Sequence, residues 1–173
     1  MVKAVFWDKD GTIMELVHRG DGLYTAPWYL AEMKFCEGIF SSMEKTAKAG
    51  FLNIIVTNQP DLETVMDIVE FGKIKSFMMD NLPIDGFFYE SHRFSERYKP
   101  NPGMVEEAVK RYRIEIDRSF LIGDSDKDLK LAMATGLAFI GIDSHVSGGS
   151  NFGLAAPLSI RQAVEIIVQE HKH

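Results

Sequence analysis

Cysteine is nearly absent from this 173-residue sequence, because Cys36 is its only one. A single cysteine excludes a disulfide within the chain and a cysteine-rich zinc site. Long hydrophobic runs are missing as well, and no stretch approaches the roughly 18 apolar residues that a membrane span needs. The short apolar run at the N-terminus meets Asp8 too soon for a signal peptide. We therefore expect a soluble, cytoplasmic protein with no membrane partner.

Positive charge is also scarce. The 19 lysines and arginines are outnumbered by 25 aspartates and glutamates, which gives a formal net charge of −6. This acidic balance argues against a nucleic-acid partner, because a polyanion would be repelled. Hydrophobic residues make up 46% of the chain and charged residues 25%, which excludes a mostly disordered protein. The length favours a single domain over residues 1–173.

Short apolar runs alternate with amphipathic stretches along the chain. Runs this short, rich in β-branched and aromatic residues, predict buried strands. They cover residues 2–7, 52–57, 86–89, 120–123 and 138–142. Apolar residues at helical spacing predict helices at 39–47, 62–69, 102–112, 129–133 and 160–168. Strands that alternate with helices indicate an α/β fold with a parallel sheet covered on both faces.

Two stretches fit neither pattern. Residues 13–35 contain Gly20, Gly22 and Pro27 among scattered aromatics, and we expect a long loop or flap there. Residues 144–157 are rich in Gly, Ser and Asn and are also expected to form a loop. The spacers between the predicted strands and helices leave no room for a large cap domain.

Polar side chains follow the predicted strands where each strand ends. Ligands of open parallel sheets bind beyond the carboxyl ends of the strands, so these side chains are candidates for one site. They are Asp8 and Asp10 after the first strand, Thr57, Asn58 and Gln59 after the second, Asp124 and Asp128 after the fourth, and Lys99 before the helix near residue 102.

The chemistry of this set favours a metal and a phosphate. Carboxylates gathered at one point repel each other, and a hard divalent cation such as Mg²⁺ relieves that repulsion. Asp8 and Asp124 suit Mg²⁺, while Lys99 and the side chains after the second strand suit phosphate oxygens. Asp8 and Asp10, two residues apart, suit a nucleophile and a general acid/base for phosphoryl transfer through an aspartyl-phosphate.

Each motif taken singly has an ordinary structural explanation. Asp8-Lys9-Asp10-Gly11 is typical of a turn, Asp124 and Asp128 are typical of a helix start, and a lone lysine is usually solvated. Only their joint occurrence, in order and each at a strand end or helix start, favours a site over these explanations.

Together these residues resemble the haloacid dehalogenase-like (HAD-like) phosphatase superfamily. The resemblance spans roughly residues 2–142 and consists of four motifs: Asp8-x-Asp10-Gly11-Thr12, Thr57-Asn58, Lys99, and Gly123-Asp124-x-x-x-Asp128. Thr57-Asn58-Gln59 and Lys99-Pro100-Asn101-Pro102-Gly103-Met104 are similar to the branch that contains histidinol-phosphate and heptose-1,7-bisphosphate phosphatases.

The resemblance implies roles for the matched residues. Asp8 would be the nucleophile and Asp10 the general acid/base. Mg²⁺ would be held by the Asp8 carboxylate, the Asp10 backbone carbonyl and the Asp124 carboxylate. Thr57, Asn58 and Lys99 would bind phosphate, and Asp128 would support the metal and the lysine. The implied fold is a three-layer α/β/α Rossmann-like sandwich with the first strand central and little or no cap.

The sequence departs from that branch in places that bear on the substrate. Many members carry a zinc loop, and its four ligand positions read Glu90, His92, Ser95 and Arg97 here, so we predict no zinc. The arginine that usually precedes the motif lysine is Tyr98, which weakens the expectation of a bisphosphate substrate.

Two further segments bear on the substrate, namely the residues that follow Gln59 and the aromatic residues of the predicted loop at 13–35. Gln59 is followed by Pro60-Asp61 instead of a small Ser-Gly pair. Trp28 and Tyr29 could pack on a substrate ring, but we favour an anchoring role for them.

The resulting hypothesis is a Mg²⁺-dependent phosphomonoester hydrolase that acts on a small phosphorylated metabolite, namely a sugar phosphate of carbohydrate metabolism. One alternative is a polynucleotide 3′-phosphatase or nucleotidase, which the net charge disfavours. An alternative of another class is a phospho-accepting receiver-like signalling domain, which the second aspartate two residues after Asp8 disfavours. The substrate and the oligomeric state stay open at this stage.

Overall fold

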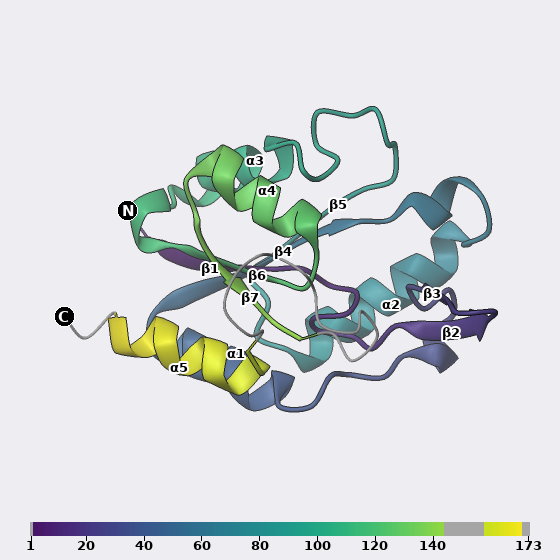
Figure 1. The fold of residues 1–173 in the computed structure, drawn as a ribbon, viewed down its shortest axis with the longest axis horizontal. Coiled ribbons are helices and arrows are strands. Elements are labelled where there is room, and N and C mark those ends of the chain that lie inside the picture. The colour runs from purple at the N-terminus through teal and green to yellow at the C-terminus, as the bar shows by residue number, and fades with distance from the viewer. Residues whose placement is uncertain (1, 144–157, 171–173) are drawn as a thin grey trace.

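The computed structural model describes residues 2–143 and 158–170, so the predicted loop at 144–157 lies outside the described residues. Its centre is a parallel five-stranded sheet in the order β5-β4-β1-β6-β7, with β1 in the middle as predicted (Figure 1). The strands are β1 (Lys3–Trp7), β4 (Phe51–Asn58), β5 (Gly86–Glu90), β6 (Phe120–Gly123) and β7 (Ala138–Gly141). Each of the five predicted strands is confirmed to within one residue at either end.

Helices cover both faces of the sheet and complete the three predicted layers (Figure 1). One face carries α1 (Ile39–Lys48), α2 (Ile68–Asn81) and α5 (Ile160–Glu170), and the other carries α3 (Gly103–Tyr112) and α4 (Asp126–Thr135).

The central strand shows why the layers form. Val5 and Trp7 of β1 pack into the core beneath α1, α2 and α5, while Ala4 and Phe6 pack into the core beneath α3 and α4. Successive side chains of a strand point to opposite faces, so a strand that is apolar from Ala4 to Trp7 needs cover on both faces of the sheet.

The register of β1 places the strand ends side by side. Trp7 pairs with Ile55 of β4 on one side and with Ile122 of β6 on the other. Asp8, the residue after Trp7, therefore emerges at the edge of the sheet where β4 and β6 also end.

The helix predicted at 62–69 is wrong in position. Residues 60–63 form a short 3-10 helix, η2 (Pro60–Glu63), and the long helix α2 begins only at Ile68. The Asp67 side chain accepts hydrogen bonds from the backbone of Val69 and Glu70, which caps α2 at that point. Val65, 53% exposed, does not reach the core, although its spacing from Leu62 and Val69 looks helical.

The predicted loop at 13–35 contains more structure than expected. It forms a small antiparallel hairpin of β2 (Val17–Gly20) and β3 (Leu23–Thr25), followed by the 3-10 helix η1 (Leu30–Glu32). The turn between the strands has positive φ at Gly20, Asp21 and Gly22, and two of these three positions are glycines that adopt this conformation without strain. We call residues 17–32 the flap.

A third 3-10 helix, η3 (Ile116–Arg118), precedes β6. Within the described residues, none of the helices combines the length and the apolar character that crossing a bilayer requires.

Candidate active site

Lys99 joins two of the predicted aspartates. Its Nζ lies 2.6 Å from Oδ1 of Asp8 and 2.7 Å from Oδ1 of Asp128. Lys99 is 3% exposed and Asp128 is fully buried. Oδ2 of Asp128 accepts hydrogen bonds from the backbone and hydroxyl of Ser125 in a capping box that starts α4. Asp128 therefore contacts the lysine and caps the helix.

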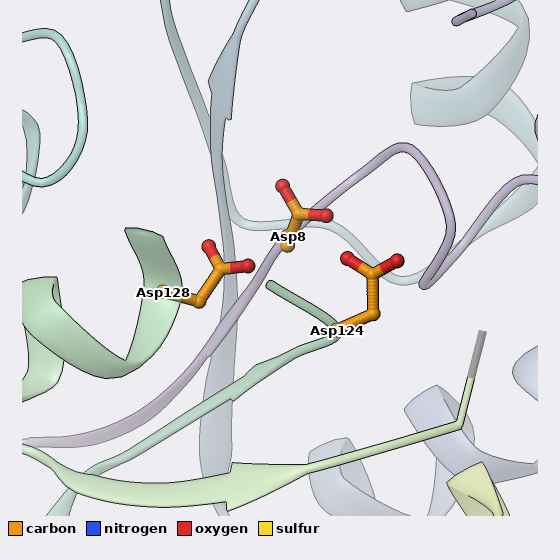
Figure 2. Close-up of side chains that lie close together, drawn as sticks. All are labelled: Asp8, Asp124 and Asp128. Atoms are coloured by element: carbon orange, nitrogen blue, oxygen red, sulfur yellow. The ribbon is translucent and has the colours of Figure 1, made fainter. Parts of the chain in front are cut away.

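Asp124 completes a cluster of three carboxylates with Asp8 and Asp128. One ligand atom from each lies within 4.8 Å of the others. Figure 2 shows Asp8 between its two neighbours, with Asp8 after β1, Asp124 after β6 and Asp128 on α4. The three residues thus meet at the carboxyl edge of the sheet, as the positions of the strand ends predict.

Gly11 allows the turn after β1 to approach Asp124. Its φ is +87°, and a Cβ at this position would lie 2.3 Å from Oδ2 of Asp124. Any other residue would therefore clash with the carboxylate as well as strain the backbone. The glycine of the Asp-x-Asp-Gly motif is needed at this position to keep the acids close.

Burial and neighbouring charges shift the two central pKa values. Burial raises the pKa of Asp8 well above its usual range, and the carboxylates of Asp128 and Asp124 add to the rise while Lys99 opposes it. Burial alone would lower the pKa of Lys99, but Asp128 and Asp8 outweigh it and raise the pKa, so the ammonium stays charged.

The cluster fits a divalent cation. Two of its three carboxylates, those of Asp8 and Asp128, contact the ammonium group of Lys99, and a metal would reduce the repulsion among all three. Oxygen ligands grouped in this way are those that Mg²⁺ prefers. The side chain of Asp10 is not one of the three clustered carboxylates.

Asn58 and Thr57 lie beside the lysine, at the end of β4. Oδ1 of Asn58 accepts from the Lys99 backbone N–H at 2.8 Å, and its Nδ2 donates to the Lys99 carbonyl at 2.9 Å. Asn58 therefore positions the backbone of Lys99, a contact that the sequence did not predict. The Thr57 hydroxyl is buried and accepts from Nε2 of Gln59 at 2.8 Å.

Two residues to which the sequence assigned no role hold Asp10. Nζ of the fully buried Lys9 lies 2.5 Å from Oδ1 of Asp10, and Nε2 of Gln59 lies 2.7 Å from Oδ2. Lys9 is the variable residue of the Asp-x-Asp motif, and Gln59 follows Thr57-Asn58 directly. Gln59 belongs to the matched Thr57-Asn58-Gln59 segment, whereas the position of Lys9 between the two motif aspartates is its only indication in the sequence of a place in the site.

The four positions that correspond to the zinc loop are joined mainly by polar contacts. Ser95 donates to Oε2 of Glu90 at 2.8 Å, and its hydroxyl accepts from the backbone of Arg97 at 3.1 Å. The backbone N–H of His92 also donates to Glu90, while the His92 ring lies 3.2 Å from Glu63. A network centred on Glu90 therefore holds the loop that leads to Lys99.

The flap is anchored through Trp28. The indole Nε1 donates to Asp61 of η2 at 2.7 Å, and the guanidinium of Arg19 lies 3.9 Å from the ring centroid. Arg19 also forms a two-point ion pair with Glu32, at 2.6 and 2.7 Å. Trp28 therefore ties the flap to the turn that follows Gln59, which favours the anchoring role, whereas Tyr29 is half exposed.

Comparison with known proteins finds relatives in sequence and solved structures of the same fold. The family model described as HAD-hydrolase-like matches residues 97–157. A D-glycero-β-D-manno-heptose-1,7-bisphosphate 7-phosphatase of Photorhabdus laumondii is 29% identical over 96% of this chain and 90% of its own length. A protein of the same name from Helicobacter pylori is 28% identical over 73% of this chain and 75% of its own.

Solved structures share the fold. The D,D-heptose 1,7-bisphosphate phosphatase of B. bronchiseptica, complexed with magnesium and phosphate, superposes with a TM-score of 0.77. It is 21% identical, and the alignment covers 97% of this chain and 99% of that one.

The chain therefore has the parallel α/β fold seen in HAD-like phosphatases, with an acid cluster at the carboxyl edge of its sheet, and residues 97–157 are similar to the HAD-hydrolase-like family. Over nearly its whole length the chain is also similar in sequence to a heptose-bisphosphate phosphatase.

Proposed function

We propose that the chain is a Mg²⁺-dependent phosphatase of small sugar phosphates, with Asp8 as its nucleophile. The observation that carries this proposal is the contact of Asp8 with Lys99 inside the cluster formed with Asp124 and Asp128. A nucleophilic carboxylate must meet an electrophilic phosphorus whose oxygens are negative, so cations have to screen the approach. The cluster supplies one fixed ammonium and a set of ligands for a metal.

The metal and the lysine would have distinct tasks. Mg²⁺, when bound to Asp8, Asp124 and the Asp10 carbonyl, would neutralise charge on the phosphoryl oxygens. Lys99 orients the Asp8 carboxylate, and Asp128 holds the lysine in place. The hydroxyl of Thr57 and the remaining donor hydrogen of Asn58 would bind the phosphate oxygens.

Asp10 would act as general acid and then as general base. It first donates a proton to the leaving oxygen while Asp8 forms its bond to phosphorus. It then takes a proton from the water that hydrolyses the aspartyl-phosphate. The two-residue spacing brings both carboxylates into the turn closed by Gly11, and Lys9 with Gln59 fixes Asp10 there.

The substrate proposal rests on the relatives and on the site. The named relatives act on heptose 1,7-bisphosphate, and we propose a sugar phosphate of that chemical class. The Arg97 guanidinium forms an ion pair with the Glu107 carboxylate at 3.1 Å, and Tyr98 is buried. Neither side chain is therefore positioned to bind a second phosphate. A monophosphate is therefore the better candidate. We also propose that the enzyme works in the cytoplasm and carries no zinc.

The testing experiment is a phosphate-release screen across phosphorylated metabolites, with Mg²⁺ and with EDTA. It should include heptose bisphosphate, histidinol phosphate, nucleotides and 3′-phosphorylated oligonucleotides. We expect Mg²⁺-dependent turnover of sugar phosphates and none after Asp8→Asn in a folded protein. Faster turnover of 3′-phosphorylated oligonucleotides would replace the substrate proposal, and unchanged turnover in Asp8→Asn would refute the nucleophile.

A further inference from the structure

Gln59 connects the end of β4 to the acid/base residue Asp10. Its side chain is 1% exposed, and its Nε2 donates to Oδ2 of Asp10 at 2.7 Å and to the hydroxyl of Thr57 at 2.8 Å. The backbone N–H of Gln59 donates to the carbonyl of Glu90 on the neighbouring strand at 2.8 Å. The amide is therefore fixed both at its backbone and at its nitrogen.

The other end of the same amide has no partner. Oε1 of Gln59 is buried without a hydrogen bond among the described residues. A buried acceptor without a partner costs free energy, so a residue serving packing alone would be better apolar. If the amide were flipped, its oxygen would lie against the Asp10 carboxylate and the two oxygens would repel each other. The amide is therefore oriented with its N–H group toward Asp10. The N–H group that Gln59 donates to Asp10 therefore explains why a glutamine occupies this buried position.

Lys9 and Gln59 hold Asp10 in different ways. Lys9 is adjacent to Asp10 in the chain and moves with the same turn. Gln59 directly follows β4, so its bond fixes Asp10 relative to the end of the neighbouring strand and to Thr57. Loss of the Gln59 donor would leave the Asp10 carboxylate bound at one oxygen only, by a partner that does not locate it relative to β4.

We propose that Gln59 is a positioning residue for Asp10 and thereby determines which leaving groups the enzyme can expel. This inference rests on the proposed phosphatase function. In the first step the Asp8–phosphorus bond forms and the bond from phosphorus to the substrate oxygen breaks. The electron pair goes to that oxygen, and the proton comes from Asp10. A sugar alkoxide leaves poorly and needs the proton delivered in position, whereas p-nitrophenolate leaves without one.

The test compares two leaving groups in one variant. Gln59→Met keeps a similar volume and removes the donor, and Gln169→Met on the exposed end of α5 is the matched control. The measured quantity is kcat/KM, because it reports the steps up to departure of the leaving group. For a sugar phosphate we expect Gln59→Met to lower kcat/KM by about tenfold to a hundredfold. For p-nitrophenyl phosphate we expect a change within about twofold, and none for Gln169→Met.

Several outcomes would overturn the proposal. Equal losses on both substrates would assign Gln59 a general structural role, and no loss on either would remove its link to Asp10. If the wild type releases no phosphate from either substrate with Mg²⁺, the proposed function fails instead. A crystal structure of Gln59→Asn, one methylene shorter, decides the positioning claim without activity. We expect the Asp10 carboxylate to leave its present position, and an unmoved carboxylate would overturn the inference even if Gln59→Met does not fold.

Discussion

The Nζ atom of Lys99 lies 2.6 Å from Oδ1 of Asp8, and both side chains are almost fully buried. The contact joins residues 91 positions apart in the chain. Asp8 stands at the end of the central strand β1, and Lys99 stands in the loop before α3, so the fold itself creates the pair. A buried lysine at this distance orients the carboxylate and leaves the second oxygen of Asp8 for other partners, such as the hydroxyl of Thr12 at 3.4 Å.

Lys99→Met should destabilise the protein and abolish phosphatase activity. Removing the ammonium leaves the Asp8 and Asp128 carboxylates buried without their cation, and breaking a buried ion pair in this way costs about 3–5 kcal/mol. Urea unfolding monitored by circular dichroism measures the change in the free energy of unfolding. Lys130→Met, which removes an exposed pair with Asp126, is the control and should cost less than about 1 kcal/mol. Equal costs would contradict the role of the buried pair.

Two acids in the first turn of α4 should respond very differently to truncation. Asp128→Ala removes both the capping box with Ser125 and a partner of Lys99, so we expect a loss of about 2–4 kcal/mol. Asp126→Ala removes only an exposed carboxylate of the same helix turn, and its cost should stay below about 1 kcal/mol. Thermal melting of the two variants measures the difference. A similar drop in melting temperature for both would show that Asp128 stabilises the protein no more than Asp126 does.

Mg²⁺ should stabilise the folded protein through Asp124. A ligand that binds only the native state adds about 2.7 kcal/mol at a concentration one hundred times its dissociation constant. We expect the melting temperature of the wild type to rise with added MgCl₂, and the rise to disappear in Asp124→Asn. Asp117→Asn, in η3, is the matched control that should keep the rise. A Mg²⁺ response retained in Asp124→Asn would place the metal elsewhere.

The ion pair between Arg19 and Glu32 should make the flap sensitive to acid. The hydrogen bonds from Arg19 hold the pKa of Glu32 below its usual value, although burial opposes them. A carboxyl with a lowered folded-state pKa stabilises the protein above its unfolded pKa of about 4.3, and this contribution is lost as pH falls through the folded value.

The variant Glu32→Gln isolates this effect. It should be less stable than the wild type at pH 7, and the difference should shrink as the pH falls below about 4. Urea unfolding across pH measures the difference, with Glu96→Gln, an exposed residue, as the control. A difference that does not change with pH would show that the charge of Glu32 contributes nothing.

The strands and the acid cluster could be predicted because they depend on short-range features of the sequence. A run such as residues 120–123 is apolar at every position, which few structures other than a buried strand accommodate. Ligands of parallel sheets bind at the carboxyl ends of the strands, so the positions of the strands predict that Asp8 and Asp124 lie in one site. Lys99 could be assigned to the site only from the order of the motifs, because the residues next to it in the sequence do not distinguish it from a surface lysine.

Other features depend on contacts that periodicity does not reveal. The start of α2 is set by the Asp67 cap, while the apolar residues before it only imitate a helical face. The flap is held by the Trp28 contact with Asp61, between residues 33 positions apart. The contact of Gln59 with Asp10 could not be predicted, because it joins two segments that follow different strands of the sheet.

The most direct test of the account is the detection of a phosphoryl group on Asp8. Enzyme mixed with a sugar phosphate and Mg²⁺ is quenched with acid during turnover, digested and analysed by mass spectrometry. We expect the peptide that contains Asp8 to carry one phosphoryl group, and Asp8→Asn to carry none. A phosphoryl group found on another residue during active turnover would contradict the assignment of Asp8 as the nucleophile.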